Sequence, residues 1–288
     1  MDEAAAATEP EILIPLHLRP SRMLCVGDPK QLPASVSSPR ATSFGLDKSL
    51  LERLMYGCGK EHVMLDVQYR MAPPISEFPR AMFYSGKLSN GKNVQDPTYK
   101  SNLFSSNEDP YKFIQVQGKE SRVGTGSYCN HEEAKVVVRL VQHIRNASHM
   151  QNDDVKSWAS IDKLRIITFY SGQVYTIKRM LREVGLGQVM VATVDSSQGC
   201  ESDIVIVSFV RCEGVMHEDA SARHSRVGFL NDIRRINVAI TRAKFRLFCV
   251  GDAQNTLLRS NSDTVSGLAN DAIQRNLIGN AENLRLIK

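Results

Sequence analysis

The sequence lacks three patterns, and each absence excludes a class of protein or site. Its six cysteines include no C-x-x-C pair and no nearby histidine pair, which argues against a zinc site. No apolar run approaches the roughly 18 residues of a membrane span, and the first residues contain no secretory signal. No G-x-x-x-x-G-K-[S/T] phosphate loop occurs, so this chain alone lacks the usual cradle for the phosphates of a nucleoside triphosphate.

The composition is that of an ordinary globular protein. The 288 residues are enough for one large domain or two small ones, and 42% are hydrophobic and 23% charged. A net charge of +5 permits a polyanionic partner without proving one. With no membrane segment and no disulfide pattern, we expect a cytoplasmic or nuclear protein, with no membrane partner.

Apolar periodicity predicts alternating strands and helices, and hence an α/β fold with a parallel sheet covered by helices on both faces. Strands are expected at 22–26, 62–67, 111–116, 164–169, 189–194, 203–209 and 245–250. A first helix is expected to begin at about residue 9, and Pro15 should end or bend it. Further helices are expected at 46–56, 73–82, 131–145, 172–184, 231–242 and 264–277. Two polar segments, 96–110 and 212–227, are expected to be irregular surface insertions.

Two helix starts are specific predictions. Thr8 and Glu11 form a capping box, with Pro10 in the first turn. Asn130 is the expected N-cap of the 131–145 helix, with Glu133 at its third position.

Four short motifs follow one another along the chain, and each alone has an ordinary interpretation. They are GDPKQLP (27–33), QYRM (68–71), VDSSQGCE (194–201) and NVAITRAK (237–244). GDPKQLP could be a simple Asp-Pro turn after a strand, although seven such residues make that the weaker interpretation. Arg70 could pair with Asp66 or Glu77, and Arg242 could belong to a solvated basic face with Arg234, Arg235 and Lys244.

In this order the motifs resemble the later motifs of a superfamily 1 helicase of the up-frameshift and senataxin-like type, from Asp2 to about Asp252. The resemblance implies a RecA-like P-loop NTPase fold. It assigns residues 1–45 to the end of a first RecA-like domain and 46–288 to a second one. Ser197, Cys200 and Ala6 depart from the residues usual in the family at these positions.

The resemblance also implies roles for individual residues. Asp2 corresponds to a Mg²⁺ ligand and Glu3 to a general base, while Gln31 lies where a side chain contacts the attacking water and the γ-phosphate. Arg70 and Arg242 correspond to arginine fingers on the transferring phosphoryl group. The implied nucleotide contacts are Asp28, Gln198, Gly199 and Glu201, with Glu201 near the ribose. The implied nucleic-acid contacts are Thr193 and Ser196.

The expected function is the C-terminal motor portion of an ATP-dependent helicase acting on single-stranded RNA or DNA, with RNA favoured. ATP and Mg²⁺ are expected to bind only together with an upstream phosphate-loop half, so the 288 residues alone should lack ATPase activity. A monomer is expected, and RNA-processing or decay factors are the protein partners that the resemblance suggests. The alternative is a catalytically dead helicase remnant that binds nucleic acid or protein.

A strand-binding surface is weakly indicated by scattered side chains. The basic candidates are Lys178, Arg179, Arg182, Arg223, Arg226, Arg234, Arg235 and Lys244. The candidates for stacking on bases are Tyr69, Phe169, Tyr170 and Tyr175. At least half of these aromatic side chains are expected to lie in the core.

Overall fold

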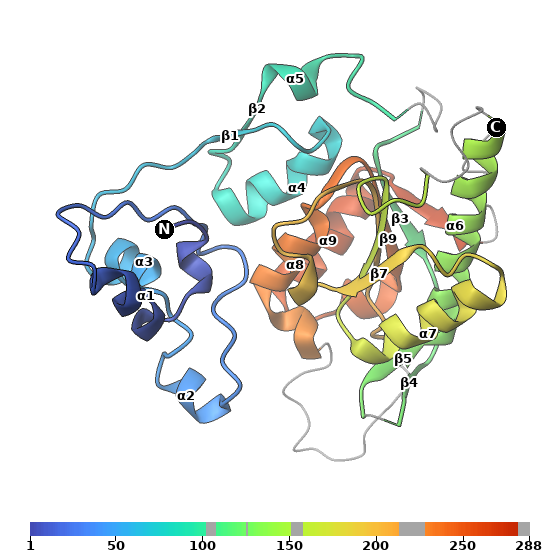
Figure 1. Cartoon of the computed structure of the whole chain (residues 1–288). Coiled ribbons are helices and arrows are strands. Elements are labelled where there is room, and N and C mark those ends of the chain that lie inside the picture. Colours follow the sequence, from blue (N-terminus) through green and yellow to red (C-terminus); the bar gives the residue numbers. More distant parts are fainter. Residues whose placement is uncertain (102–107, 125, 151–157, 213–227, 282–288) are drawn as a thin grey trace. The chain divides into compact units, whose positions relative to one another are not determined.

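The computed structural model describes residues 1–101, 108–124, 126–150, 158–212 and 228–281 (Figure 1). By its internal contacts the chain divides into a smaller unit, Met1–Leu65, and a larger unit, Asp66–Lys288. None of the described helices is both long and apolar enough to cross a membrane. Two expected insertions lie partly outside the described residues. These are residues 213–227 of the insertion expected at 212–227, and residues 102–107 of the insertion expected at 96–110.

A six-stranded parallel sheet forms the centre of the larger unit, with strand order β10-β3-β9-β8-β6-β7. Its strands are β3 (Tyr111–Gln115), β6 (Leu164–Thr168), β7 (Met190–Thr193), β8 (Ser202–Ser208), β9 (Ala243–Gly251) and β10 (Ile278–Asn280). The five strands predicted between residues 111 and 250 are confirmed, whereas the short edge strand β10 was not predicted. Neither were two small pairs, parallel β1 (Val67–Gln68) with β2 (Ser89–Asn90) and antiparallel β4 (Glu120–Arg122) with β5 (Tyr128–Asn130).

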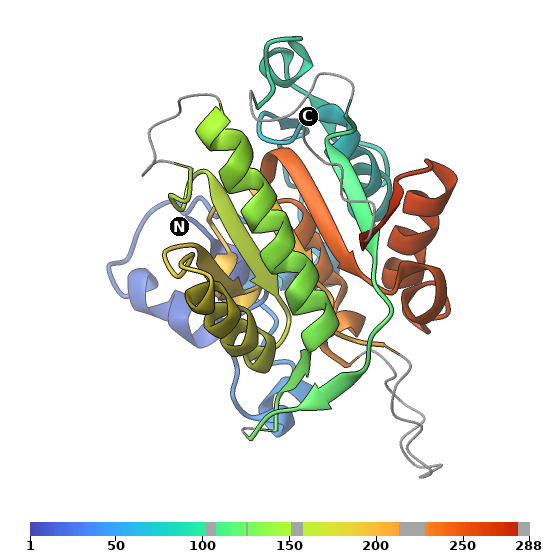
Figure 2. The ribbon, with the colours of Figure 1, turned by 90° about the vertical axis from the view of Figure 1, so that its right-hand side faces the viewer.

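Helices cover both faces of this sheet, as predicted. On one face lie α6 (His131–Met150) and α7 (Ser171–Glu183), seen in front of the strands in Figure 2. The other face carries α4 (Pro73–Tyr84), α8 (Ile233–Ile240) and α9 (Asp263–Gln274), which also pack on one another. A four-residue helix, α5 (Lys92–Gln95), follows β2.

The main apolar core lies between the sheet and the α6–α7 layer. Alternate residues of the central strands point into it, among them Leu164 and Ile166 of β6 and Ile204 and Ile206 of β8. Every position of β6 is buried, as expected for a parallel strand covered on both faces. Gly185, with φ at 72°, follows the α7 helix in the left-handed conformation that favours glycine.

A buried carboxylate lies at the start of α6. The side chain of Asn130 accepts a hydrogen bond from the Glu133 amide at 3.1 Å, which confirms the predicted cap. The Glu133 carboxylate accepts bonds from Ser208 Oγ at 2.6 Å and from the Val210 amide at 2.8 Å. Burial of this side chain raises its pKa from 4.5 to about 8.

We therefore expect the stability of the protein to fall as the pH rises from about 5 to about 9, because the folded state holds the Glu133 proton more tightly than the unfolded chain does. Glu133→Gln keeps an acceptor for the Val210 amide and cannot ionise. The variant should match the wild type near pH 6 and exceed it in free energy of unfolding near pH 9. Denaturant titrations at both pH values measure this. Glu132→Gln, an exposed neighbour, is the control, and identical pH dependence in wild type and Glu133→Gln would contradict the assignment.

The smaller unit, residues 1–65, contains helices but no strand. It comprises α1 (Glu9–Leu16), α2 (Pro39–Ser43) and α3 (Leu50–Glu52), the last continuing as a π-helical turn over Arg53–Gly57. The capping box of Thr8 and Glu11 is present, as predicted. Pro15 lies inside α1, which ends one residue later.

Two strand predictions in the first third of the chain are wrong. Residues 22–26 form no strand, because the Met1–Ala4 backbone beside them supplies only a few hydrogen bonds, such as Val26 N to Met1 O at 2.8 Å. In 62–67 only Val67 enters a strand, and Val63 and Leu65 are 91% and 80% exposed. An apolar run becomes a parallel strand only where neighbouring strands and helices bury it.

Candidate functional site

The GDPKQLP motif forms a turn closed by its own side chains. One carboxylate oxygen of Asp28 accepts the Lys30 amide at 2.9 Å, and the other accepts Gln31 Nε2 at 3.0 Å. The Gln31 amide also donates to the Asp28 carbonyl at 3.0 Å. Asp28 therefore positions the carboxamide of Gln31, a pairing that the sequence did not reveal.

Gly27 brings the first residues of the chain against this turn. A Cβ atom at Gly27 would lie 2.8 Å from the Ala5 nitrogen and 2.9 Å from the Ala4 nitrogen, so only glycine permits the contact. The Ala4 amide donates to the Val26 carbonyl at 2.8 Å. Asp2 and Glu3 are exposed and come directly before the residues that contact Gly27. The contact therefore joins the segment of Asp2 and Glu3 to the turn of Asp28 and Gln31 within the smaller unit.

The described residues do not by themselves form a Mg²⁺ site. None of them belongs to a group of three acidic, histidine or cysteine side chains able to hold a metal ion. Asp2 Oδ1 accepts the adjacent Glu3 amide at 2.9 Å, and the Asp2 side chain is exposed. Asp2 would supply one ligand at most, so we derive no chemical step through the metal.

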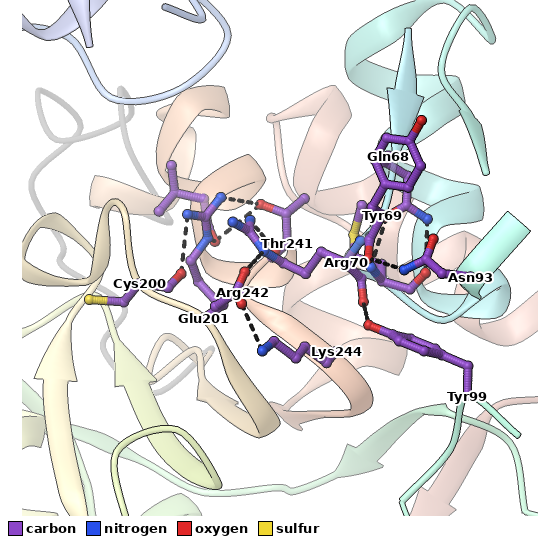
Figure 3. Close-up of polar contacts among 12 residues, drawn as sticks. Gln68, Tyr69, Arg70, Asn93, Tyr99, Cys200, Glu201, Thr241, Arg242 and Lys244 are labelled. Carbon is purple, nitrogen blue, oxygen red and sulfur yellow. Dashed lines mark hydrogen bonds and ion pairs between the residues drawn. The ribbon is translucent and has the colours of Figure 1, made fainter. Parts of the chain in front are cut away.

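In the larger unit, Arg70 is held by its own motif. Gln68 Oε1 accepts the amides of Arg70 and Met71 at 3.0 and 2.8 Å, and the Tyr99 hydroxyl donates to the Arg70 carbonyl at 2.6 Å (Figure 3). These contacts leave the Arg70 guanidinium directed toward the 201 and 241 regions. The roles of Gln68 and Tyr99 as supports were not predicted.

Glu201 lies between two cations. Arg70 Nε donates to its Oε2 at 2.7 Å, and Lys244 Nζ contacts its Oε1 at 2.7 Å (Figure 3). The hydrogen bond from Lys244, followed by that from Arg70, lowers the pKa of Glu201, which stays ionised at neutral pH. Arg70 therefore pairs with Glu201 rather than with Asp66 or Glu77, so that alternative is wrong.

Arg242 lies at the junction between α8 and β9, where it is only 3% exposed. Its guanidinium donates to the carbonyls of Val238 at 3.1 Å and Cys200 at 3.4 Å, and to Thr241 Oγ1 at 2.9 Å. The interpretation as a solvated basic face is therefore wrong for Arg242. The helix ends at Ile240, so the side chain turns inward instead of continuing the exposed face of α8.

Three motifs thus meet at one place in the larger unit, as Figure 3 shows. Arg70 Nη1 donates to the Thr241 carbonyl at 3.2 Å, next to the Arg242 guanidinium. Glu201 directly precedes β8, and Arg242 directly precedes β9, so the cluster lies at the amino ends of two neighbouring strands. Arg70, Arg242 and Lys244 outnumber the single carboxylate in this cluster, and such an arrangement attracts an anion.

The VDSSQGCE segment connects the parallel strands β7 and β8 and contains only a short 3-10 turn, Asp195–Ser197. Gly199 adopts φ of 74°, which reverses the chain before Glu201. The hydroxyls of Thr193 and Ser196 lie 3.1 Å apart, and both residues are accessible, while Ser197 is buried. Gln198 is half-buried in the same turn.

Some of the aromatic and basic candidates for a strand-binding surface are exposed, and others are buried or held in ion pairs. Phe169 and Tyr170 lie in the core, whereas Tyr69 and Tyr175 are 63% and 64% exposed, so the expectation that at least half are core is confirmed. Arg235 is engaged by Asp195 and Asp232, both at 3.1 Å. Arg223 and Arg226 lie outside the described residues.

Comparisons with known proteins agree with this arrangement of motifs. A family model described as "AAA domain" matches residues 46–254, and a second model with the same description matches residues 1–39. Helicase sen1 of Schizosaccharomyces pombe is 32% identical over 96% of this chain and 16% of its own length. The Regulator of nonsense transcripts 1 homolog of Drosophila melanogaster is 36% identical over 88% of the chain and 20% of its own length. The ATP-dependent helicase NAM7 of Saccharomyces cerevisiae is 35% identical over 89% of this chain and 26% of its own length.

The chain therefore belongs to the AAA-domain family of superfamily 1 helicases of the up-frameshift and senataxin-like type, and corresponds to their C-terminal region. The predicted α/β class, with a parallel sheet covered by helices on both faces, is confirmed by the structure. The chain spans 16–26% of the length of these three relatives.

Proposed function

We propose that this chain supplies the second-domain half of an ATP-dependent helicase motor that moves along single-stranded nucleic acid, with RNA favoured. The observation that carries the proposal is the convergence of Arg70, Glu201 and Arg242, from three separate motifs, around Thr241 and Lys244. In this proposal residues 1–45 close a first RecA-like domain and residues 46–288 form a second one.

Arg70 and Arg242 act as arginine fingers in this proposal. A guanidinium stabilises the charge that spreads over the transferring phosphoryl group, and the loss of one finger typically lowers the rate by about 10³–10⁵. Glu201 holds Arg70 in position and contacts the ribose side of the nucleotide together with Gln198 and Gly199. In the complete motor Asp2 would supply one ligand to Mg²⁺, and Glu3 would act as the general base for the attacking water. Gln31 would contact that water and the γ-phosphate, and Asp28, which holds the Gln31 carboxamide, would line the nucleotide site.

Thr193 and Ser196 contact the strand. Both residues are accessible, Thr193 at the end of β7 and Ser196 in the turn before Gly199 and Glu201, so one short segment serves both ligands. Hydroxyl contacts to phosphate oxygens position a strand without reading its sequence, as a translocating motor requires. A movement of Gly199 and Glu201 on nucleotide binding or release would then change the contacts of Thr193 and Ser196 with the strand.

Hydrolysis requires a phosphate loop that these 288 residues do not contain. Such a loop makes several charge-assisted hydrogen bonds of roughly 1.5–3 kcal/mol each. The whole binding free energy of a micromolar to millimolar ligand is only about 4–8 kcal/mol. Without the loop the chain should therefore have no useful affinity for ATP.

The proposal is tested by comparing this chain alone with the same chain joined to an upstream segment of a relative that carries the phosphate loop, called here the joined protein. The chain alone should show no ATP hydrolysis above background. The joined protein should hydrolyse ATP, and single-stranded RNA should stimulate it. Strand binding without hydrolysis in a folded joined protein would favour the alternative, a catalytically dead binding remnant, and robust hydrolysis by the chain alone would contradict the argument from the missing loop.

A further inference from the structure

A surface pocket of about 420 Å³ opens beside β7, the outermost strand of the sheet. It is lined by residues of β6 and the turn before it, α7, β7 and the connection after β7, including Ile161, Arg165, Lys178, Met190, Thr193 and Ser196. This volume falls in the range of about 300–1,000 Å³ that small-molecule sites occupy. Thr193 and Ser196 are the proposed strand contacts, and the carbonyl of Cys200, which also lines the pocket, accepts a hydrogen bond from Arg242. Arg165, Lys178 and Met190 have no role in the site described above.

The short connection between β7 and β8 explains why a pocket forms here. Parallel strands are usually joined by a dozen or more residues that include a helix, which covers the sheet. Residues 194–201 make this connection with only the 3-10 turn Asp195–Ser197 and no α-helix. Ile166 and Val191 point into the core beneath α6 and α7, so their neighbours Arg165 and Met190, which pair across the two strands, point to the opposite face. Because β7 is the edge strand, the pocket takes lining residues from both sides of it, Lys178 from the α7 side and Arg165 from the other.

Arg165 is the unusual residue of this pocket. It is 3% exposed, and its Nε atom has no hydrogen-bond partner among the described residues. Nor does any described carboxylate form an ion pair with it. A buried guanidinium with an unpaired Nε and no carboxylate beside it is unfavourable, so its charge is best satisfied by an anion that enters the pocket.

The other lining residues indicate the chemistry of that anion. Lys178 of α7 is half-buried and adds a second cation, and the hydroxyls of Thr193 and Ser196 add hydrogen-bonding groups. Ile161 and Met190 provide an apolar wall. Two cations, two hydroxyls and an apolar wall match a phosphate group that carries a sugar or a base.

We propose that this pocket binds one nucleotide unit of the single strand, with Arg165 and Lys178 on its phosphate. The inference rests on the proposed strand binding and adds a phosphate contact, Arg165, that lies outside the four motifs. A free nucleoside monophosphate shares the same chemistry. The experiment therefore includes both sources of phosphate.

The test uses the full chain and fluorescence anisotropy with a labelled single-stranded RNA at several salt concentrations. Arg165→Met and Lys178→Met should each weaken binding by about tenfold or more. Each should also reduce the slope of log K against log salt by about 0.7, the value for one phosphate contact on a single strand. Arg139→Met, an exposed arginine of α6 with the same charge change, is the control and should stay within about twofold.

Thermal unfolding separates a ligand-binding role of Arg165 from a structural one. Arg165→Met replaces an unpartnered buried charge with an apolar side chain, so the Tm of the free protein should rise or stay unchanged. Uridine monophosphate and inorganic phosphate should raise the Tm of the wild type more than that of Arg165→Met. A large fall in Tm in this variant, with strand affinity unchanged, would mean that Arg165 is structural and would overturn the proposal.

The outcomes distinguish this proposal from the proposed function. If the wild type binds RNA and both pocket variants bind equally well, the pocket assignment fails and the strand-binding function stands. If the wild type binds no RNA but the monophosphate stabilises it through Arg165, the pocket holds a free nucleotide and strand binding by this chain fails. If neither ligand binds, both fail.

Discussion

Arg242→Ala in the joined protein should leave the affinity for ATP within a few-fold and lower the turnover rate by roughly 10²–10⁴. The guanidinium of a finger acts mainly on the charge that develops in the transition state, so its loss affects turnover far more than binding. Arg242→Lys should restore little of the rate, because an ammonium group cannot reproduce the planar guanidinium fork. Steady-state ATPase assays with separate measurement of nucleotide binding provide the readout.

The burial of Arg242 requires a control for structural damage. Its side chain also donates to the Val238 and Cys200 carbonyls, and these contacts join the end of α8 to the turn before Glu201. Thr241→Val removes the hydroxyl that accepts from Arg242 Nη2 and leaves the guanidinium in place. This variant should retain turnover within about tenfold. Unchanged turnover in a folded Arg242→Ala protein would remove the central assignment.

Arg70→Ala in the joined protein should also reduce turnover by about 10²–10⁴. Glu201→Gln should instead raise the KM for ATP several-fold with a smaller effect on turnover, since Glu201 orients Arg70 and contacts the ribose side. The Arg70–Glu201 pair is partly exposed, with side chains 32% and 42% accessible, so its loss should change stability by only about 0–1 kcal/mol.

A double-mutant cycle over Arg70 and Glu201 shows whether Arg70 acts on the nucleotide or only on its partner. If Arg70 contacts phosphate directly, the double variant should be close to Arg70→Ala alone and far below Glu201→Gln. Equal losses in the two single variants, with no further loss in the double variant, would mean that Arg70 merely positions Glu201. Lys244→Met, which removes the second partner of Glu201, is the matched charge control.

Much of the larger unit could be predicted from the sequence because its signals are local. The strands at 164–168 and 202–208 are apolar runs of strand length, and α6 begins at a cap residue followed by a clear amphipathic face. The apolar runs at 22–26 and 62–67 have the same local signal and form no comparable strands. What differs is the surroundings, since no neighbouring strands and helices bury these two segments.

The candidate site shows the same division. Arg70, Glu201 and Arg242 are identified by short motifs, but their partners are not. Nothing local in NVAITRAK indicates that Arg242 is buried against the Cys200 carbonyl, or that Lys244 contacts the carboxylate of Glu201. The pairing of Arg70 with Glu201 joins residues 131 positions apart.

By itself the sequence determined the helicase family, the α/β class and the short motifs, because each of these depends on residue types at fixed spacing. The tertiary structure decided which charges meet. Glu201 and Arg242 lie side by side because parallel pairing of β8 with β9 aligns the residues that precede both strands, and the carboxylate of Glu201 then meets Arg70 and Lys244. Arg165 appears as an ordinary residue of a strand in the sequence. Only the pairing of β6 with β7, next to a connection that contains no α-helix, places it in the wall of a pocket, buried and without a hydrogen bond at Nε.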